Sequence, residues 1–229
     1  MPYSRVSAIK NTGFKIKTLL KVPCFSVDLK KIRQLEKPYL VTLSPNTRYQ
    51  IRRSIREYEL KSGQISLSFA KNKEQAVQFF REAGDMHKDR WDDSGFNNSD
   101  FTRFHENLIH DNFDYKLIEL IKVTTATSTI AIMYNLLIDK KVYFYLQGLK
   151  YEEHKKIKPG LVAHSLITQY YIDKGMELYD YMGGYSQYKS QLASHSTDCY
   201  TICIQRPLFK FSLENMARKF KYFINRKFQ

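Results

Sequence analysis

The 34-residue stretch Lys158–Gln191 constrains the fold of this chain most strongly, because it carries four successive secondary-structure signals. Pro159 begins an apolar stripe with helical spacing, and Gly175 ends it. Residues 178–182 (LYDYM) are short, aromatic and strand-like, and a glycine pair follows them. The predicted stripe consists of Leu161, His164, Ser165, Ile167, Thr168, Tyr171 and Ile172. The stretch therefore predicts a helix, a buried strand, a glycine turn and a second, short helix.

The segments around this stretch alternate between strand and helix patterns. Ser44 and Asn72 stand where a helix cap is expected, since their side chains accept hydrogen bonds from free N–H groups. We predict helices over 45–62, 73–89 and 100–110, and strands over 64–70, 115–123, 129–139, 141–149 and 197–205, with strand-like pieces at 21–29 and 39–43. From residue 64 the order is β-α-α-β-β-β-α-β-α-β. An antiparallel meander followed by a βαβ crossover predicts an α+β fold, with a mixed, mostly antiparallel sheet and helices on both faces.

The same patterns divide the chain into three parts. Residues 1–43 read as an N-terminal extension, residues 44–209 as one domain, and residues 210–229 as a basic amphipathic tail. The apolar residues of the tail repeat at helical spacing and basic residues occupy the other positions. Such a tail either docks onto the domain or binds an anionic membrane surface or a partner helix.

The formal net charge is +14, which favours a polyanionic partner: nucleic acid, an anionic membrane or a phosphorylated ligand. Three cysteines are present, without the spacing of a metal site. Cys199 and Cys203 lie on one predicted strand, too far apart to form a disulfide with each other. We therefore expect no bound metal and a reducing, cytoplasmic location.

Two basic features indicate anion binding. The helix start at Pro159 offers outward N–H groups and the positive end of a helix dipole. The helix 45–62 places Arg48, Arg52 and Arg56 on one face, with Arg53 beside them. This face is either a solvated surface or a phosphate-binding one, because arginine forks match phosphate geometry.

Three blocks resemble a known family. They are the basic helix RYQIRRSIREYELKSG (Arg48–Gly63), the block MHKDRWDDSGFNNSDFTRFHENLI (Met86–Ile109), and KPGLVAHSLITQYYIDKGMELYDYMGGYSQYKSQLA (Lys158–Ala193). In this order they resemble the GNAT-fold acyltransferases, in particular the FemAB-like branch and its CelD-like cellulose-biosynthesis acetyltransferases. Tyr181 stands where that family has Phe. Relatives often carry a second, similar module, so the resemblance also implies a partner or a missing N-terminal module.

The resemblance implies roles for several residues. The pyrophosphate of acyl-CoA would lie on the helix start, at Lys158, Gly160, Leu161 and Val162. Lys189 would stabilise the oxyanion of the tetrahedral intermediate.

The residues themselves leave the acid–base roles open. Asp180 lies in an aromatic strand and would either pair with Lys189 or Arg90, or act as a general base. His87 is either a half-buried core residue or the proton acceptor for an amine nucleophile. We expect the remaining substrate- or anion-binding residues to be Arg52, Arg53, Arg90, Trp91 and Tyr188.

These observations predict an N-acyltransferase that moves an acyl group, most simply acetyl, from acyl-CoA to an amine or hydroxyl acceptor by direct attack. The acceptor would be a small molecule or a cell-envelope component. Two alternatives stay open: FemAB-type aminoacyl transfer from charged tRNA, which the charge favours, and a non-catalytic module that binds an anionic surface.

Overall fold

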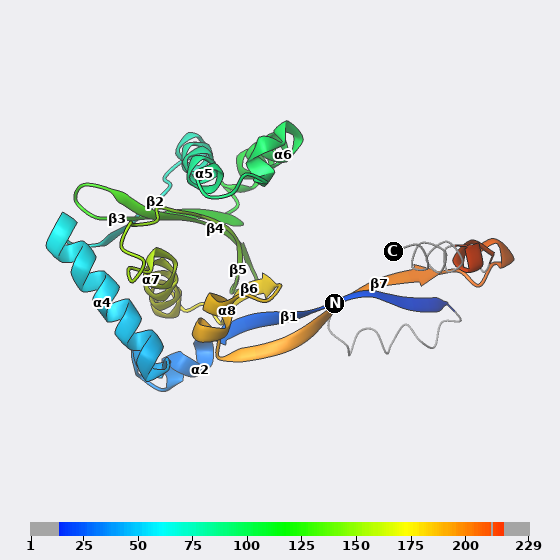
Figure 1. Ribbon diagram of the computed structural model, residues 1–229, viewed down its shortest axis with the longest axis horizontal. Helices are drawn as coiled ribbons and strands as arrows, with labels where there is room; N and C mark the ends of the chain where they lie inside the picture. The colour runs from blue at the N-terminus through cyan, green and yellow to red at the C-terminus, as the bar shows by residue number, and fades with distance from the viewer. Residues whose placement is uncertain (1–13, 212, 218–229) are drawn as a thin grey trace. The chain divides into compact units, whose positions relative to one another are not determined.

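The computed structural model describes residues 14–211 and 213–217 (Figure 1). Its elements in chain order are β1 (Lys15–Asp28), α2 (Leu29–Gln34), α3 (Tyr39–Thr42), α4 (Pro45–Ser62), β2 (Ser66–Phe69), α5 (Lys73–Lys88), the 3₁₀ helix η2 (Gly95–Asn97), α6 (Ser99–Asn112), β3 (Ile118–Thr124), β4 (Thr129–Ile138), β5 (Lys141–Leu149), α7 (Pro159–Asp173), β6 (Leu178–Gly183), α8 (Gln187–Leu192) and β7 (His195–Gln205). The strand order is β2-β3-β4-β5-β6-β1-β7. The pairs from β2 to β5 are antiparallel and β5 pairs with β6 in parallel, which confirms the predicted fold class and element order.

The chain divides into two compact units. The core unit comprises Phe25–Ser196, and the ribbon unit comprises Met1–Cys24 and Thr197–Gln229. The strand β1 belongs partly to each unit. The core unit includes residues 25–43, so the predicted extension contributes buried side chains such as Phe25 and Tyr39. The division at residues 43 and 209 stays a prediction.

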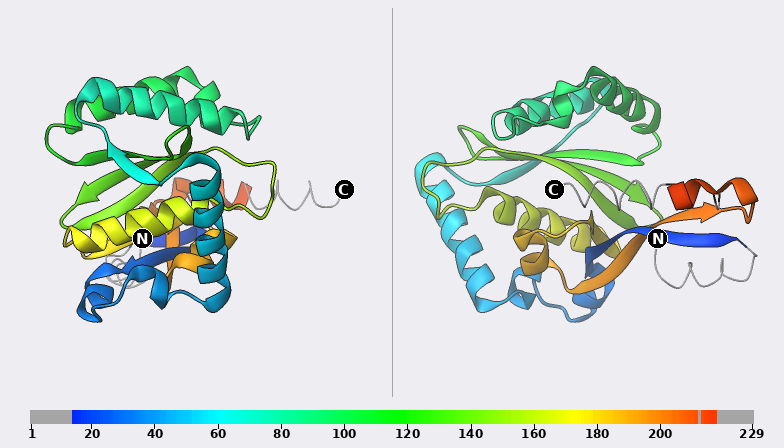
Figure 2. Two further views of the ribbon diagram at one scale, coloured as in Figure 1. Left: turned by 90° about the vertical axis from the view of Figure 1, so that its left-hand side faces the viewer. Right: turned by 45° about the vertical axis from the view of Figure 1, so that its right-hand side comes forward.

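Helices cover both faces of the sheet in the core unit, as Figures 1 and 2 show. The strand β3 illustrates the reason, since successive side chains of a strand point to opposite faces. Ile118 and Leu120 pack in one buried cluster with α5 and α6, whereas Ile121 and Val123 pack in the other with α4 and α7. Two apolar faces therefore require helices on both sides.

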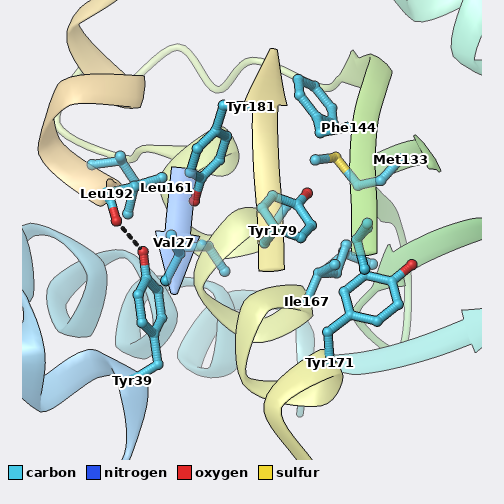
Figure 3. Close-up of a cluster of buried hydrophobic side chains, with 14 of the residues drawn as sticks. Val27, Tyr39, Met133, Phe144, Leu161, Ile167, Tyr171, Tyr179, Tyr181 and Leu192 are labelled. Atoms are coloured by element: carbon cyan, nitrogen blue, oxygen red, sulfur yellow. Dashed lines mark hydrogen bonds between the residues drawn. The ribbon is translucent and has the colours of Figure 1, made fainter. Parts of the chain in front are cut away.

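The helix α7 is buried on most of its surface, and all seven residues of the predicted stripe are buried. Val162 and Ala163 are buried as well, because β4, β6 and α4 surround the helix. Figure 3 shows Ile167 and Tyr171 of α7 in the same cluster as Tyr179 and Tyr181 of β6. A helix that is apolar on nearly every side belongs in a core, and this one fixes the position of its N-terminus.

The predicted caps begin α4 and α5. The Ser44 hydroxyl accepts a hydrogen bond from Thr47 N at 3.2 Å, and Asn72 Oδ1 accepts one from Gln75 N at 2.8 Å. The hairpin between β4 and β5 turns through Asp139 and Lys140, which both have positive φ (48° and 58°). This tight turn joins the two strands of the predicted antiparallel meander although it contains no glycine.

The strand expected at residues 39–43 was wrong, since this segment forms α3. Pro38 precedes it, Tyr39 N donates to Gln169 Oε1 at 2.7 Å, and the Tyr39 hydroxyl donates to Leu192 O at 2.6 Å (Figure 3). These tertiary bonds override the strand preference of the sequence YLVTL. The short helix α2, which Asp28 caps, was not predicted.

The tail prediction can be followed only in part. Residues 209–211 and 213–217 are helical, and residues 212 and 218–229 lie outside the described part of the chain. Among the helices that the structure describes, none combines the length and apolar character needed to cross a membrane.

Candidate active site

A cavity of about 1010 Å³ opens in the core unit beside the second half of β5. The parallel register of β5 and β6 runs from Lys141↔Leu178 to Tyr143↔Asp180, and β5 then continues to Leu149. The helix starts of α7 and α8 and the end of α5 complete the wall. Eight predicted site residues line this cavity: His87, Arg90, Trp91, Lys158, Gly160, Leu161, Tyr188 and Lys189. Residues from two of the three motif blocks, 86–109 and 158–193, thus meet at one place.

The start of α7 carries fewer backbone donors than a typical helix start. Pro159 has no N–H. The N–H of Lys158 donates to the Ser54 hydroxyl at 3.0 Å, and that of Val162 donates to Lys158 O at 3.1 Å. Helix geometry leaves the N–H groups of Gly160 and Leu161 for a ligand. Val162 is fully buried and does not line the cavity, so its side chain does not reach a ligand there. Binding of the pyrophosphate at Val162 stays a prediction.

The two arginines predicted on α4 do not line the cavity. Arg52 is exposed. The Arg53 guanidinium donates to Lys156 O in the loop before α7, and it lies 5.5 Å from the ring centre of Tyr49. Arg53 therefore holds the loop that carries Lys155 and Lys158 into the cavity wall. Direct anion binding by either arginine stays a prediction.

His87 lies at the end of α5, with Nδ1 2.9 Å from the hydroxyl of the buried residue Ser94. Partial burial lowers the pKa of His87, because desolvation disfavours the imidazolium. When Nδ1–H donates to Ser94, Nε2 is left as a proton acceptor. A neutral imidazole at a cavity wall has the protonation state that a general base requires.

Arg90 and two exposed aromatic rings form one edge of the cavity. The Arg90 guanidinium lies 4.7 Å from the ring centre of Tyr151 and 5.5 Å from that of Trp91. Trp91 is 54% exposed. Cations over aromatic faces are held by the ring quadrupole, so this edge keeps a positive charge at the mouth.

Lys189 and Asp180 lie on either side of the turn after β6. Lys189 Nζ donates to Gly183 O at 2.9 Å, and Asp180 Oδ1 accepts from Met182 N at 2.7 Å. Burial raises the pKa of Asp180, while the Met182 N–H and the charge of Lys189 oppose this rise. Lys189 lines the cavity but Asp180 does not. Of the two residues, Lys189 is therefore the one placed to contact a ligand in the cavity.

Tyr188 forms an aromatic wall behind Lys189. Its ring stacks on that of His164, with centres 5.1 Å apart and planes at 14°. Burial, with a smaller contribution from the charge of Lys189, lowers the pKa of His164 to about 3. Burial likewise raises the pKa of Tyr188 to about 12, so its hydroxyl keeps its proton at neutral pH. Two uncharged rings therefore fix the start of α8.

Tyr145 is a cavity residue that was not predicted from the sequence. The register of β4 and β5 shifts between Tyr134 and Asn135, which leaves Tyr145 as an unpaired bulge residue on β5. Its side chain lines the cavity, and its hydroxyl lies 2.9 Å from Nε2 of the buried residue His105. A bulge arises from the pairing of two strands, so the sequence of β5 alone does not reveal it.

Gly148 was also missed, and it brings α5 close to β5. A Cβ added at this glycine would lie 2.6 Å from Ala83 Cα and 2.7 Å from Ala83 O. Only the absence of a side chain permits that approach. The approach places His87, on the same helix as Ala83, at the cavity.

Known proteins share this architecture. A family model described as the acetyltransferase (GNAT) domain matches residues 45–190. FemX is similar to the chain with a TM-score of 0.66 at 13% identity, over 92% of this chain and 70% of FemX. L-PGS from Bacillus licheniformis gives 0.58 at 11% identity, over 95% of this chain and 70% of that one.

A further solved structure is the C-terminal domain of a protein from Agrobacterium fabrum named as a lysylphosphatidylglycerol synthetase. The name of that protein is a proposed one. Its domain gives a TM-score of 0.56 at 11% identity, over 95% of this chain and 69% of that one. At such identities these structures demonstrate a shared fold. No curated protein sequence matches the chain. The family model covers more than half of the 229 residues, and on this ground the chain belongs to the acetyltransferase (GNAT) domain family.

Proposed function

We propose that this protein is an acyltransferase that transfers an acyl group from acyl-CoA to an amine or hydroxyl acceptor. One observation carries the proposal: a single cavity brings the start of α7 together with Lys189 of α8 and His87 of α5. These are an anion-binding element, a cation and a neutral base, as acyl transfer by direct attack requires. The narrower CelD-like assignment stays a hypothesis, as does the cytoplasmic location.

The start of α7 would bind the pyrophosphate of the donor. Two N–H groups, from Gly160 and Leu161, and a helix dipole make a weak site by themselves, since each such dipole interaction contributes about 0.3–1 kcal/mol. Lys155 and Lys158 also line the cavity and would add charge pairing. The residues present therefore fit a diphosphate when lysines and helix act together.

The reaction would proceed without a covalent enzyme intermediate. The acceptor nitrogen or oxygen attacks the thioester carbonyl carbon, and the carbonyl π electrons move to the oxygen. Lys189 would stabilise this oxyanion, which typically contributes about a hundred- to a thousandfold in rate. The C–S bond then breaks, and the thiolate leaves and takes up a proton.

His87 is the better candidate for the base that removes the proton of the acceptor. It lines the cavity and its lowered pKa keeps it neutral near pH 7. Asp180 does not line the cavity and accepts a backbone N–H. We assign Asp180 instead to the turn that positions Lys189.

Aminoacyl transfer from charged tRNA is a second candidate. The net charge of +14 favours a nucleic-acid donor, and the start of α7 by itself offers only the N–H groups of Gly160 and Leu161 to the pyrophosphate of acyl-CoA. The C-terminal domain from Agrobacterium fabrum shares the fold of the chain, and the name proposed for its protein, lysylphosphatidylglycerol synthetase, suggests an aminoacyl donor and a lipid acceptor.

Isothermal titration calorimetry separates the two donors. The wild-type protein is titrated with acetyl-CoA, with longer acyl-CoAs, with desulfo-CoA as a thiol-free control, and with charged and uncharged tRNA. We expect saturable binding of at least one acyl-CoA, weakened by the double variant Lys155→Ala/Lys158→Ala. The absence of binding to every thioester, together with binding of charged tRNA that survives moderate salt, would replace the acyl-CoA donor by aminoacyl-tRNA.

A further inference from the structure

The described residues of the ribbon unit form no core of their own. In its described residues, 14–24, 197–211 and 213–217, no side chain is buried. Its strands β1 and β7 are neighbours in the sheet order, and Lys21 forms an ion pair with Asp198 at 2.8 Å between them. A two-stranded ribbon is only marginally stable by itself in water. The described residues of this unit therefore leave apolar contacts that a further surface would supply.

Large apolar side chains are concentrated and exposed on this unit. They are Phe14, Leu19, Leu20, Ile204, Leu208 and Phe209, together with Leu213 and Met216 of the helical segment. Phe209 is 79% exposed. Scattered apolar side chains are ordinary on protein surfaces, but eight in so short a part of the chain mark an interaction site.

Positive charge is segregated in the same unit. Met1–Cys24 contains five basic and no acidic residues, and Thr197–Gln229 contains seven basic and two acidic ones. The ribbon unit thus carries +10 of the +14 net charge in 57 residues, which leaves +4 for the 172 residues of the core unit. Such asymmetry indicates a specific anionic partner.

Exposed apolar side chains together with a high positive charge favour one kind of partner over two others. A second copy would bring two strongly positive units together, and their repulsion opposes a symmetric pair. Nucleic acid satisfies the charge but leaves the aliphatic residues Leu19, Leu20 and Leu208 without a partner, because phosphates and sugars offer them little apolar surface. An anionic bilayer supplies both an apolar boundary layer and phosphate groups.

We infer that the ribbon unit binds the surface of an anionic lipid bilayer. Leucine and phenylalanine side chains enter the boundary between headgroups and acyl chains. Lysine and arginine side chains, including Lys17, Arg206 and Lys210, pair with lipid phosphates. The inference extends beyond the proposed reaction, since the residues that carry it belong to neither the cavity nor its wall.

Vesicle flotation tests this inference on the full-length protein. The probes are vesicles of phosphatidylcholine alone and of equimolar phosphatidylcholine and phosphatidylglycerol. We expect binding to the anionic vesicles and at least tenfold weaker binding to the neutral ones. Each lysine near an anionic surface contributes about fivefold in affinity, so binding falls as salt rises.

Two variants of the ribbon unit, one apolar and one basic, each have a matched control variant in the core unit. Phe209→Ser should reduce binding to anionic vesicles about tenfold, whereas Leu60→Ser, at a residue 78% exposed on α4, should leave it unchanged. Lys17→Glu/Lys210→Glu should reduce binding at least tenfold, whereas Lys30→Glu/Lys37→Glu should not. Circular dichroism of each variant checks that it remains folded.

Several results would overturn the inference. They are equal binding to neutral and anionic vesicles, no binding to either, and equal effects of the ribbon and core variants. Retention by tRNA without vesicle binding would assign the unit to nucleic acid instead. A dimer in sedimentation velocity that both ribbon variants abolish, again without vesicle binding, would assign it to a second copy.

Discussion

The core unit buries two side-chain clusters against the two faces of its sheet, whereas the ribbon unit buries none of its described residues. The core unit nevertheless carries less than a third of the net charge, on three times as many residues. Packing in the core unit fixes a cavity whose groups are placed for chemistry. In the ribbon unit, positive charge and exposed apolar side chains are available for contact with a partner surface. Stability and catalysis should therefore respond to substitutions in the first unit and surface binding to those in the second.

The largest difference is expected in the free energy of unfolding when a phenylalanine is replaced by alanine in each unit. Phe80 is fully buried beside Tyr134 and Phe96. Phe80→Ala should lower the free energy of unfolding by about 3–5 kcal/mol, because it removes apolar contacts and leaves a cavity. Phe209→Ala should change it by less than about 0.5 kcal/mol. Urea unfolding followed by circular dichroism measures both, and similar losses would remove the distinction between the units.

The next effect concerns catalysis. Lys189→Ala should reduce turnover of an acyl donor about a hundredfold with an unchanged melting temperature, because it removes the cation proposed to face the oxyanion. Lys189→Arg should retain part of the rate. Lys210→Ala in the ribbon unit is the control and should leave turnover in solution unchanged. Thiol release from acyl-CoA measures turnover, and full activity of Lys189→Ala would remove this residue from the site.

A third effect links packing to the site. Gly148→Ala would place a Cβ against the backbone of Ala83, so α5 must move. We expect a loss of about 1–3 kcal/mol in the free energy of unfolding. Turnover should fall as well, since α5 carries His87.

Gly95→Ala is the control for that substitution, because its nearest neighbours, ring atoms of Phe101, lie at 3.7 Å, an ordinary contact distance. Equal stability of the two alanine variants would show that α5 tolerates the shift.

The last effect is a pH dependence of the free energy of unfolding that comes from His164. Its pKa in the folded protein, about 3, lies below the ordinary value of 6.5. The unfolded chain therefore binds a proton first as the pH falls. The stabilisation is complete above pH 6.5 and decreases toward pH 3, with a limiting slope of about 1.4 kcal/mol per pH unit.

Between pH 6.5 and about 5 most carboxylates stay charged, so this slope is visible there. His164→Leu should flatten it, and His110→Gln, at an exposed histidine, should not. Urea midpoints across this range measure the slope, and an unchanged slope in His164→Leu would show that another group titrates.

The sequence predicts much of the core unit because local chemistry and packing agree there. The caps at Ser44 and Asn72 and the apolar stripe of α7 each occupy the expected positions. The motif blocks also predicted eight of the residues that meet in the cavity. Periodicity and capping are properties of short segments, so a sequence without its structure reveals them.

The features that the sequence did not predict depend on contacts between distant segments. Tyr39 begins the helix α3, and its hydroxyl donates a hydrogen bond to Leu192 O, 153 positions away. Tyr145 enters the cavity wall through the bulge between β4 and β5. Asp180 and Val162, both predicted site residues, do not line the cavity, because packing decides the path of β6 and the burial of α7.

Hydrogen–deuterium exchange with and without saturating acyl-CoA tests the central claim most directly. We predict slower exchange in peptides that cover residues 158–162 and 183–190, since the donor would contact the starts of α7 and α8. Exchange in residues 197–205 of the ribbon unit should not change. Unchanged exchange at both helix starts, or protection confined to the ribbon unit, would contradict the assignment of the cavity as the acyl-transfer site.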